Sequence, residues 1–105
     1  MPANDSGTAL LMGVRANFPA DIFVLEELNS RRWSSMTFAG ARHELAFRLE
    51  GEGADREASR FLGGLSATRF PPLPGHLLAR ISLVSEERRP GNARIKIEAL
   101  TVEDQ

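Results

Sequence analysis

His43 and His76 are the side chains best suited to acid–base chemistry, because the chain has no cysteine and no tyrosine. Each histidine follows a glycine-containing turn and begins a predicted strand. In the predicted sheet these strands start at the same end, so the two rings form a candidate acid/base pair beside Glu44. No His-x-x-x-His spacing is present, and two histidines with carboxylates at no fixed spacing are a weak candidate for a metal site. We therefore interpret both as strand-end histidines and predict no catalytic residue and no metal; a small enzyme using the pair is an alternative.

The arginines form the second candidate site. Arg15, Arg48 and Arg80 alternate away from the predicted helices on three neighbouring strands. A row of guanidiniums across an open sheet face can bind a phosphate, a carboxylate or an RNA backbone. The competing interpretation, which we prefer, is cross-strand pairing with the acids of the same face, Glu44, Glu50 and Glu98.

The third candidate site is the turn Asn17-Phe18-Pro19-Ala20-Asp21-Ile22. Pro19 fits the first turn of a helix, where its missing N–H has no intrahelical partner, and Asp21 complements the helix dipole. The surrounding stretch "VRANFPADIF" resembles the start of an ACT domain, which places Asp-x-Pro-Gly-x-Leu between its first strand and first helix. Ala20 stands where that family has glycine. The simpler interpretation of the turn is a helix start and nothing more.

The resemblance covers residues 9–65 in the order and length of the elements. It implies a small ferredoxin-like module that pairs side by side with a second copy and binds an amino-acid-like effector near the turn. The residues it implies for ligand binding are Asn17, Pro19, Ala20 and Asp21.

Hydrophobic periodicity predicts the elements that position these residues. We expect strand, helix, strand, strand, helix, strand, strand over residues 8–16, 19–28, 33–38, 43–51, 55–65, 76–87 and 93–102. Asp55 is the predicted N-cap of the second helix. The stretch "TRFPPLPG" is a loop because its prolines exclude regular structure, and "RPGN" is a hairpin turn. The first helix ends at "NSRR", residues 29–32, and "AGAR", residues 39–42, is a turn. The predicted core combines one face of the strand 43–51, of the helix 55–65 and of the strand 93–102. These faces carry, in that order, Leu45, Phe47 and Leu49; Ala58, Phe61, Leu62 and Leu65; and Ile95, Ile97 and Ala99.

This order predicts an α+β fold, a ferredoxin-like βαββαβ two-layer sandwich with an additional C-terminal β-strand. The sheet order is 2-3-1-4, and both helices lie on one face. We expect a disordered lead over residues 1–7 and a single domain over 8–105. In the alternative, residues 8–17 are helical and continue into the next segment, which gives the order α-β-β-α-β-β.

Composition narrows the function classes. The net charge of −1 gives no electrostatic attraction to nucleic acid, so that partner is not expected. No apolar run can span a membrane and no secretory signal is present, so we expect a cytoplasmic protein. No P-loop or Gly-x-Gly-x-x-Gly is present, and no cofactor is expected. The predicted open face exposes Leu11, Leu78 and Val84 beside the arginines, so we expect a homodimer. The function predicted is a small non-enzymatic regulatory or ligand-binding module.

Overall fold

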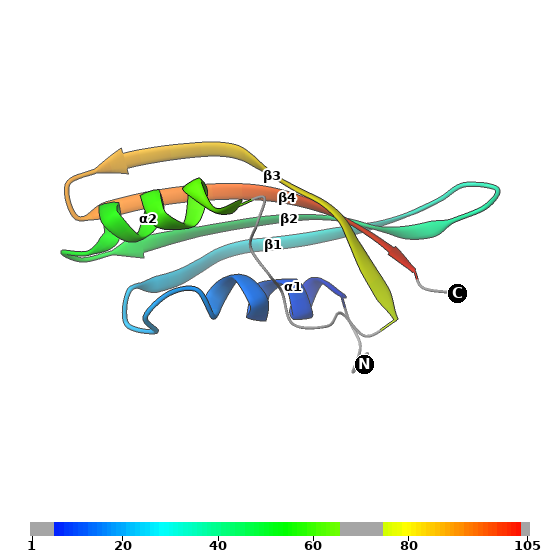
Figure 1. Cartoon of the computed structure of the whole chain (residues 1–105), viewed down its shortest axis with the longest axis horizontal. Coiled ribbons are helices and arrows are strands. Elements are labelled where there is room, and N and C mark those ends of the chain that lie inside the picture. The colour runs from blue at the N-terminus through cyan, green and yellow to red at the C-terminus, as the bar shows by residue number, and fades with distance from the viewer. Residues whose placement is uncertain (1–5, 66–74, 104–105) are drawn as a thin grey trace.

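The computed structural model describes residues 6–65 and 75–103. Two helices and four strands follow in the order α1 (Ser6–Arg15), β1 (Phe23–Ser34), β2 (Ala39–Glu50), α2 (Ala54–Gly63), β3 (His76–Arg89) and β4 (Asn92–Glu103). The strands form one antiparallel sheet in the order β1-β2-β4-β3. Both helices pack on the same face of this sheet, with α2 over β2 and β4 and α1 beside β1 (Figure 1). The fold is therefore an α+β two-layer sandwich.

The ferredoxin-like order is not confirmed, since the chain runs helix, strand, strand, and then repeats that order once. The alternative order α-β-β-α-β-β is the one observed. Each strand pair is a hairpin, and β2 and β4 meet at the centre of the sheet. Four strands are present among the described residues, where the prediction had five. Nearly all of the predicted "TRFPPLPG" loop lies outside the described residues.

The prediction of a strand over residues 8–16 is wrong, because these residues form most of α1. Leu10 and Val14, four residues apart, are fully buried, whereas Met12 between them is exposed. Burial at this spacing is that of a helix, and a short apolar run does not distinguish a buried strand from a buried helix. Ser6 and Gly7, placed in the predicted lead, are buried residues of the first turn of α1.

The prediction of a helix over residues 19–28 is also wrong, because β1 begins at Phe23. A β-bulge at Glu26 shifts the register, so Leu25 lies opposite Phe47 and Leu28 lies opposite Leu45. The extra residue separates two apolar side chains by three positions rather than two. A spacing of three is also that of one face of a helix, so the sequence pattern predicted a helix where β1 lies.

The end of β1 and the start of β2 also differ from prediction. The hairpin turn lies at Ser35–Phe38, where the Ser35 N–H donates to the Phe38 carbonyl at 2.7 Å. The predicted strand over 33–38 therefore contains the turn, and the predicted turn at 39–42 belongs to β2. Both strands have 12 residues, long enough to carry the hairpin past the helices (Figure 1).

The core residues of β2 and β4 are confirmed, because Leu45, Phe47, Leu49, Ile95 and Ile97 are fully buried. The aromatic rings of Phe18, Phe23, Phe47 and Phe61 join α2 and the loop after α1 to the sheet, with centroids 5.1 to 6.0 Å apart. The hairpin turn at residues 90–91 is confirmed too, and Gly91 adopts a φ of 73° there. The cap of α2 is Gly53 rather than the predicted Asp55, which lies in the first turn.

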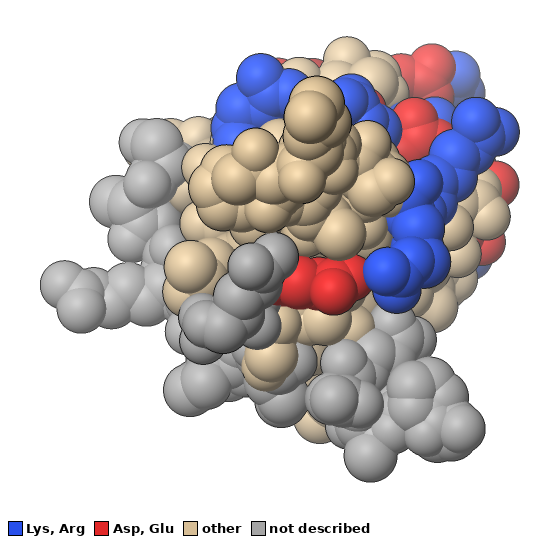
Figure 2. Space-filling model, turned by 90° about the vertical axis from the view of Figure 1, so that its right-hand side faces the viewer, with Lys and Arg blue, Asp and Glu red and all other residues tan. Residues whose placement is uncertain are grey.

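The molecule is elongated, with extents of 47 × 23 × 22 Å. Figure 2 views it from the end of the β1–β2 hairpin, where Met36 and Phe38 are exposed. Basic and acidic side chains gather along one side in this view. The two described helices have ten residues each and are too short to cross a membrane.

Candidate anion-binding face

The sheet face away from the helices is charged rather than apolar. Leu11, expected there, lies on α1, and Leu78 packs against the core. Val84 is the extra residue of a β3 bulge and is half exposed. The face instead carries the residues that alternate with the core along β2 and β4. They are Arg42, Glu44, Ala46, Arg48, Arg94, Lys96, Glu98 and Leu100. The predicted homodimer, which relied on an apolar open face, stays a prediction.

Glu26, the bulge residue of β1, neutralises a pair of like charges. Arg48 and Arg94 lie directly opposite each other on β2 and β4. Both guanidiniums donate to the Glu26 carboxylate, at 2.9 Å from Arg48 and 3.1 Å from Arg94. Burial raises the pKa of the Glu26 carboxyl, but the hydrogen bonds from the two arginines outweigh it, so this pKa lies below its ordinary value. Glu50 and Glu26 together raise the pKa of Arg48 through their hydrogen bonds.

A row of three arginines crosses the open face nearer to the β1–β2 turn. Arg31 of β1 lies opposite Arg42 of β2, and Arg42 and Arg80 flank Leu100 of β4. Arg42 and Arg80 share one carboxylate, that of Glu98, at 3.2 and 3.9 Å. Arg31 makes no ion pair within residues 6–65 and 75–103. The row therefore has three cations, and the Glu98 carboxylate pairs with two of them, Arg42 and Arg80.

A hollow of about 230 Å³ lies beside Arg31. It is lined by two successive cross-strand pairs of the β1–β2 hairpin, Arg31 with Arg42 and Asn29 with Glu44. The hollow thus combines two guanidiniums, one amide and one carboxylate. The two guanidiniums can bind a carboxylate or phosphate group through charge-assisted hydrogen bonds, whereas the Glu44 carboxylate repels such a group.

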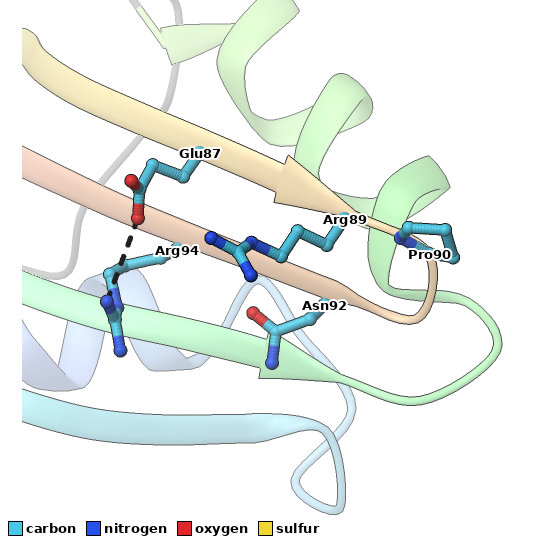
Figure 3. A pocket seen from close by; sticks show the side chains of 5 residues that line it. All are labelled: Glu87, Arg89, Pro90, Asn92 and Arg94. Carbon is cyan, nitrogen blue, oxygen red and sulfur yellow. Dashed lines mark ion pairs between the residues drawn. The ribbon is translucent and has the colours of Figure 1, made fainter.

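A second hollow of about 390 Å³ lies at the end of the β3–β4 hairpin (Figure 3). Its lining has the same composition with a proline added: Glu87, Arg89, Pro90, Asn92 and Arg94. Arg94 is held by Glu26 at 3.1 Å and more loosely by Glu87 at 3.7 Å. Arg89 makes no ion pair in the described part of the chain, and Figure 3 shows its side chain between those of Arg94 and Asn92.

The predicted arginine row does not form. Arg15 is in the last turn of α1 and is not on the sheet. Arg48 and Arg80 are on the open face, but their partners on β4, Arg94 and Leu100, are six residues apart. At the rise of a strand this separation is about 20 Å. Arg31 and Arg42, which form the observed row with Arg80, were missed because residues 29–32 were assigned to the end of a helix and 39–42 to a turn.

The predicted effector turn lies between α1 and β1. The Asn17 side-chain amide donates to the Gly13 and Val14 carbonyls at 2.9 and 3.3 Å and so closes the C-terminus of α1. The Asn17 carbonyl accepts a hydrogen bond from Arg60 of α2. Pro19, Ala20 and Asp21 are exposed, whereas Phe18 between them and Asn17 is in the core. Binding of an effector at these residues stays a prediction.

The two histidines are not brought together. His43 of β2 lies opposite Ala99 of β4, whereas His76 of β3 lies opposite Glu103. These positions are four residues apart on β4, about 14 Å along the strand and about 10 Å across the sheet. The strand between them is β4 rather than the first strand. No group of three metal-ligating side chains gathers in the part of the chain that the structure describes.

His43 is nevertheless held in a hydrogen-bonded cluster of hydroxyl groups. Its side chain is 1% exposed, and its Nδ1 lies 2.7 Å from the Ser30 Oγ. On the other side of the ring, Nε2 lies 3.0 Å from the Thr101 Oγ1 and 3.2 Å from the Ser6 Oγ. The sequence analysis interpreted His43 as a strand-end histidine, and nothing in the sequence placed the three hydroxyls around it.

No family model, curated protein or solved structure matches the chain.

Proposed function

We propose that the chain is a small binding module whose open sheet face holds a ligand with a carboxylate or phosphate group in the β1–β2 hollow. The observation that carries this proposal is Arg31, a strand guanidinium that lines the hollow and has no ion-pair partner in the described residues. Arg42 beside it has its only ion pair, within those residues, with Glu98.

The cross-strand position of Arg31 and Arg42 supports oxyanion binding. Side chains directly opposite each other in an antiparallel pair have Cβ atoms about 4.5 to 5.5 Å apart, and like charges there repel. An oxyanion between the two guanidiniums replaces this repulsion by charge-assisted hydrogen bonds. The Asn29 amide supplies a further donor on the same wall.

Glu44 narrows the class of ligand. Its carboxylate lines the same hollow and repels a ligand with several negative charges. It attracts an ammonium group, so a molecule with one carboxylate and one ammonium is complementary to this lining. An amino-acid-like ligand meets this description. A nucleic-acid backbone does not, because Glu44 and Glu98 lie opposite each other beside the arginine row.

A thermal-melting screen tests the proposal. Free amino acids, dicarboxylates and inorganic phosphate are added to the wild type, to Arg31→Gln and to the matched control Arg56→Gln, which removes an exposed arginine of α2. At a ligand concentration 100 times Kd, binding stabilises the fold by about 2.7 kcal/mol. We expect one ligand class to raise the Tm of the wild type and the control but not of Arg31→Gln.

Two outcomes would contradict this assignment. If no compound changes the Tm, the hollow is not a ligand site for these chemical classes. If the same compound raises the Tm of Arg31→Gln equally, binding is elsewhere. Loss of that response in Ala20→Val would then favour the turn between α1 and β1.

A further inference from the structure

The hydroxyl cluster around His43 is a directional hydrogen-bond chain. The Thr101 hydroxyl donates its single proton to the Ala41 carbonyl at 3.3 Å. With that proton engaged, the Thr101 oxygen can accept from the His43 Nε2, 3.0 Å away, when the neutral ring carries its proton on Nε2. In this tautomer the Nδ1 lone pair faces the Ser30 Oγ at 2.7 Å, and the Ser30 hydroxyl donates to it.

One end of this hydrogen-bonded series of side chains, the Ser30 end, reaches solvent. His43 and Thr101 are 1% and 0% exposed, and Ser6, which also contacts Nε2, is 5% exposed. Ser30 is exposed on β1. A molecule arriving from solvent therefore meets the Ser30 hydroxyl, behind which lies a buried imidazole that accepts its proton.

We propose that Ser30 is a nucleophile for carbonyl or phosphoryl esters and that His43 is its general base. In this step the Ser30 Oγ bonds to the carbonyl carbon while its proton moves to the His43 Nδ1. The same proton then passes to the departing alkoxide as the ester C–O bond breaks, which leaves an acyl group on Ser30. Water hydrolyses this acyl-serine with His43 again as the base. The Thr101 oxygen accepts from Nε2–H throughout and keeps the ring in the required tautomer.

Arg32 supplies a positive charge on the same side of the sheet. It is two residues beyond Ser30 on β1, and alternate residues of a strand point to the same face. Its guanidinium pairs with Glu103 at 2.8 Å, and its side chain is 77% exposed. In the proposed step this guanidinium is the cation that attracts the negative oxygen developing when Ser30 attacks.

Labelling with an alkyl fluorophosphonate tests the nucleophile. The Ser30 Oγ forms a bond to phosphorus, the P–F bond breaks, fluoride leaves, and the proton of the hydroxyl goes to His43. We expect a single adduct by mass spectrometry in the wild type, no adduct in Ser30→Ala, and an unchanged adduct in Ser35→Ala, whose hydroxyl lies in the exposed hairpin turn. An unlabelled wild type, or equal labelling of Ser30→Ala, would overturn the proposal.

The absence of cysteine from the chain permits a second test that leaves His43 in place. In Ser30→Cys the imidazole lowers the thiol pKa by stabilising the thiolate, whereas in Ser35→Cys it does not. Alkylation by iodoacetamide at pH 6 should be at least about tenfold faster for Ser30→Cys. Equal rates in two variants with the same circular dichroism spectrum would show that His43 is not a base for position 30.

Discussion

Replacing Gly40 with alanine should strongly destabilise the protein. Gly40 is buried near the start of β2, between Trp33 of β1 and Val102 of β4. A Cβ at this position would overlap the Thr101 carbonyl oxygen and lie 2.9 Å from the Thr101 carbonyl carbon and from the Trp33 Cζ2. The indole can move, but the Thr101 carbonyl belongs to the β4 backbone, so β2 and β4 must separate locally.

The expected cost is at the upper end of the range for overpacking, about 3 kcal/mol, because the obstacle is backbone. That is a large part of the stability of a single domain, about 5 to 15 kcal/mol. With about 4 to 8 °C lost per kcal/mol for a domain of this size, the Tm should fall by roughly 12 to 24 °C.

Thermal unfolding followed by circular dichroism measures this change, and Gly63→Ala is the matched control. No atom lies within 4 Å of a Cβ added at Gly63 in α2, so this variant should be unchanged or stabilised by up to about 1 kcal/mol. A Gly40→Ala protein that melts within a few degrees of the wild type would refute the register of β2 and β4 given above.

Three further predictions concern the core, the bulge and the end of α1. Phe47→Ala should cost about 3 to 5 kcal/mol in urea unfolding, since Phe47 contacts three other rings and is fully buried; a loss under 1 kcal/mol would contradict the aromatic cluster. The folded-state pKa of Glu26 lies below its ordinary value of 4.5, so its contribution to stability is complete above pH 4.5 and is lost as the pH falls through the lower pKa. The Tm difference between wild type and Glu26→Gln should therefore be largest above pH 4.5 and shrink below it; a constant difference would speak against the arginine contacts. Asn17→Ala should lower stability by about 1 kcal/mol through loss of its bonds to the α1 carbonyls, measured against Asp21→Ala as a neutral control.

Alternation of apolar residues was enough to predict β2 from residue 43 onward, β4, and the buried face of both strands. Leu45, Phe47 and Leu49 repeat at intervals of two, and so do Ile95 and Ile97, because each strand is covered on one side only. No bulge interrupts either strand in the register between them. The two-residue alternation of apolar side chains is therefore uninterrupted in both sequences and predicts the buried face.

The first third of the fold could not be predicted in this way. The apolar run of α1 is too short for its period to decide between helix and strand, and the bulge at Glu26 gives β1 the spacing of a helix. The first error moved Arg15 onto a sheet that it does not join, and the second left Arg31 off the open face. Arg42 was missed separately, because residues 39–42 were predicted as a turn. The candidate site was missed because it depends on the cross-strand register of β1 and β2, which is set by tertiary pairing.

NMR of the arginine Nε–Hε groups tests whether Arg31 and Arg42 hold an oxyanion. The protein is titrated with the ligand found in the melting screen. We predict saturable shifts confined to Arg31 and Arg42, absent in Arg31→Gln and retained in Arg56→Gln. Shifts that do not saturate, or that spread equally over the arginines of both sheet faces, would contradict the claim.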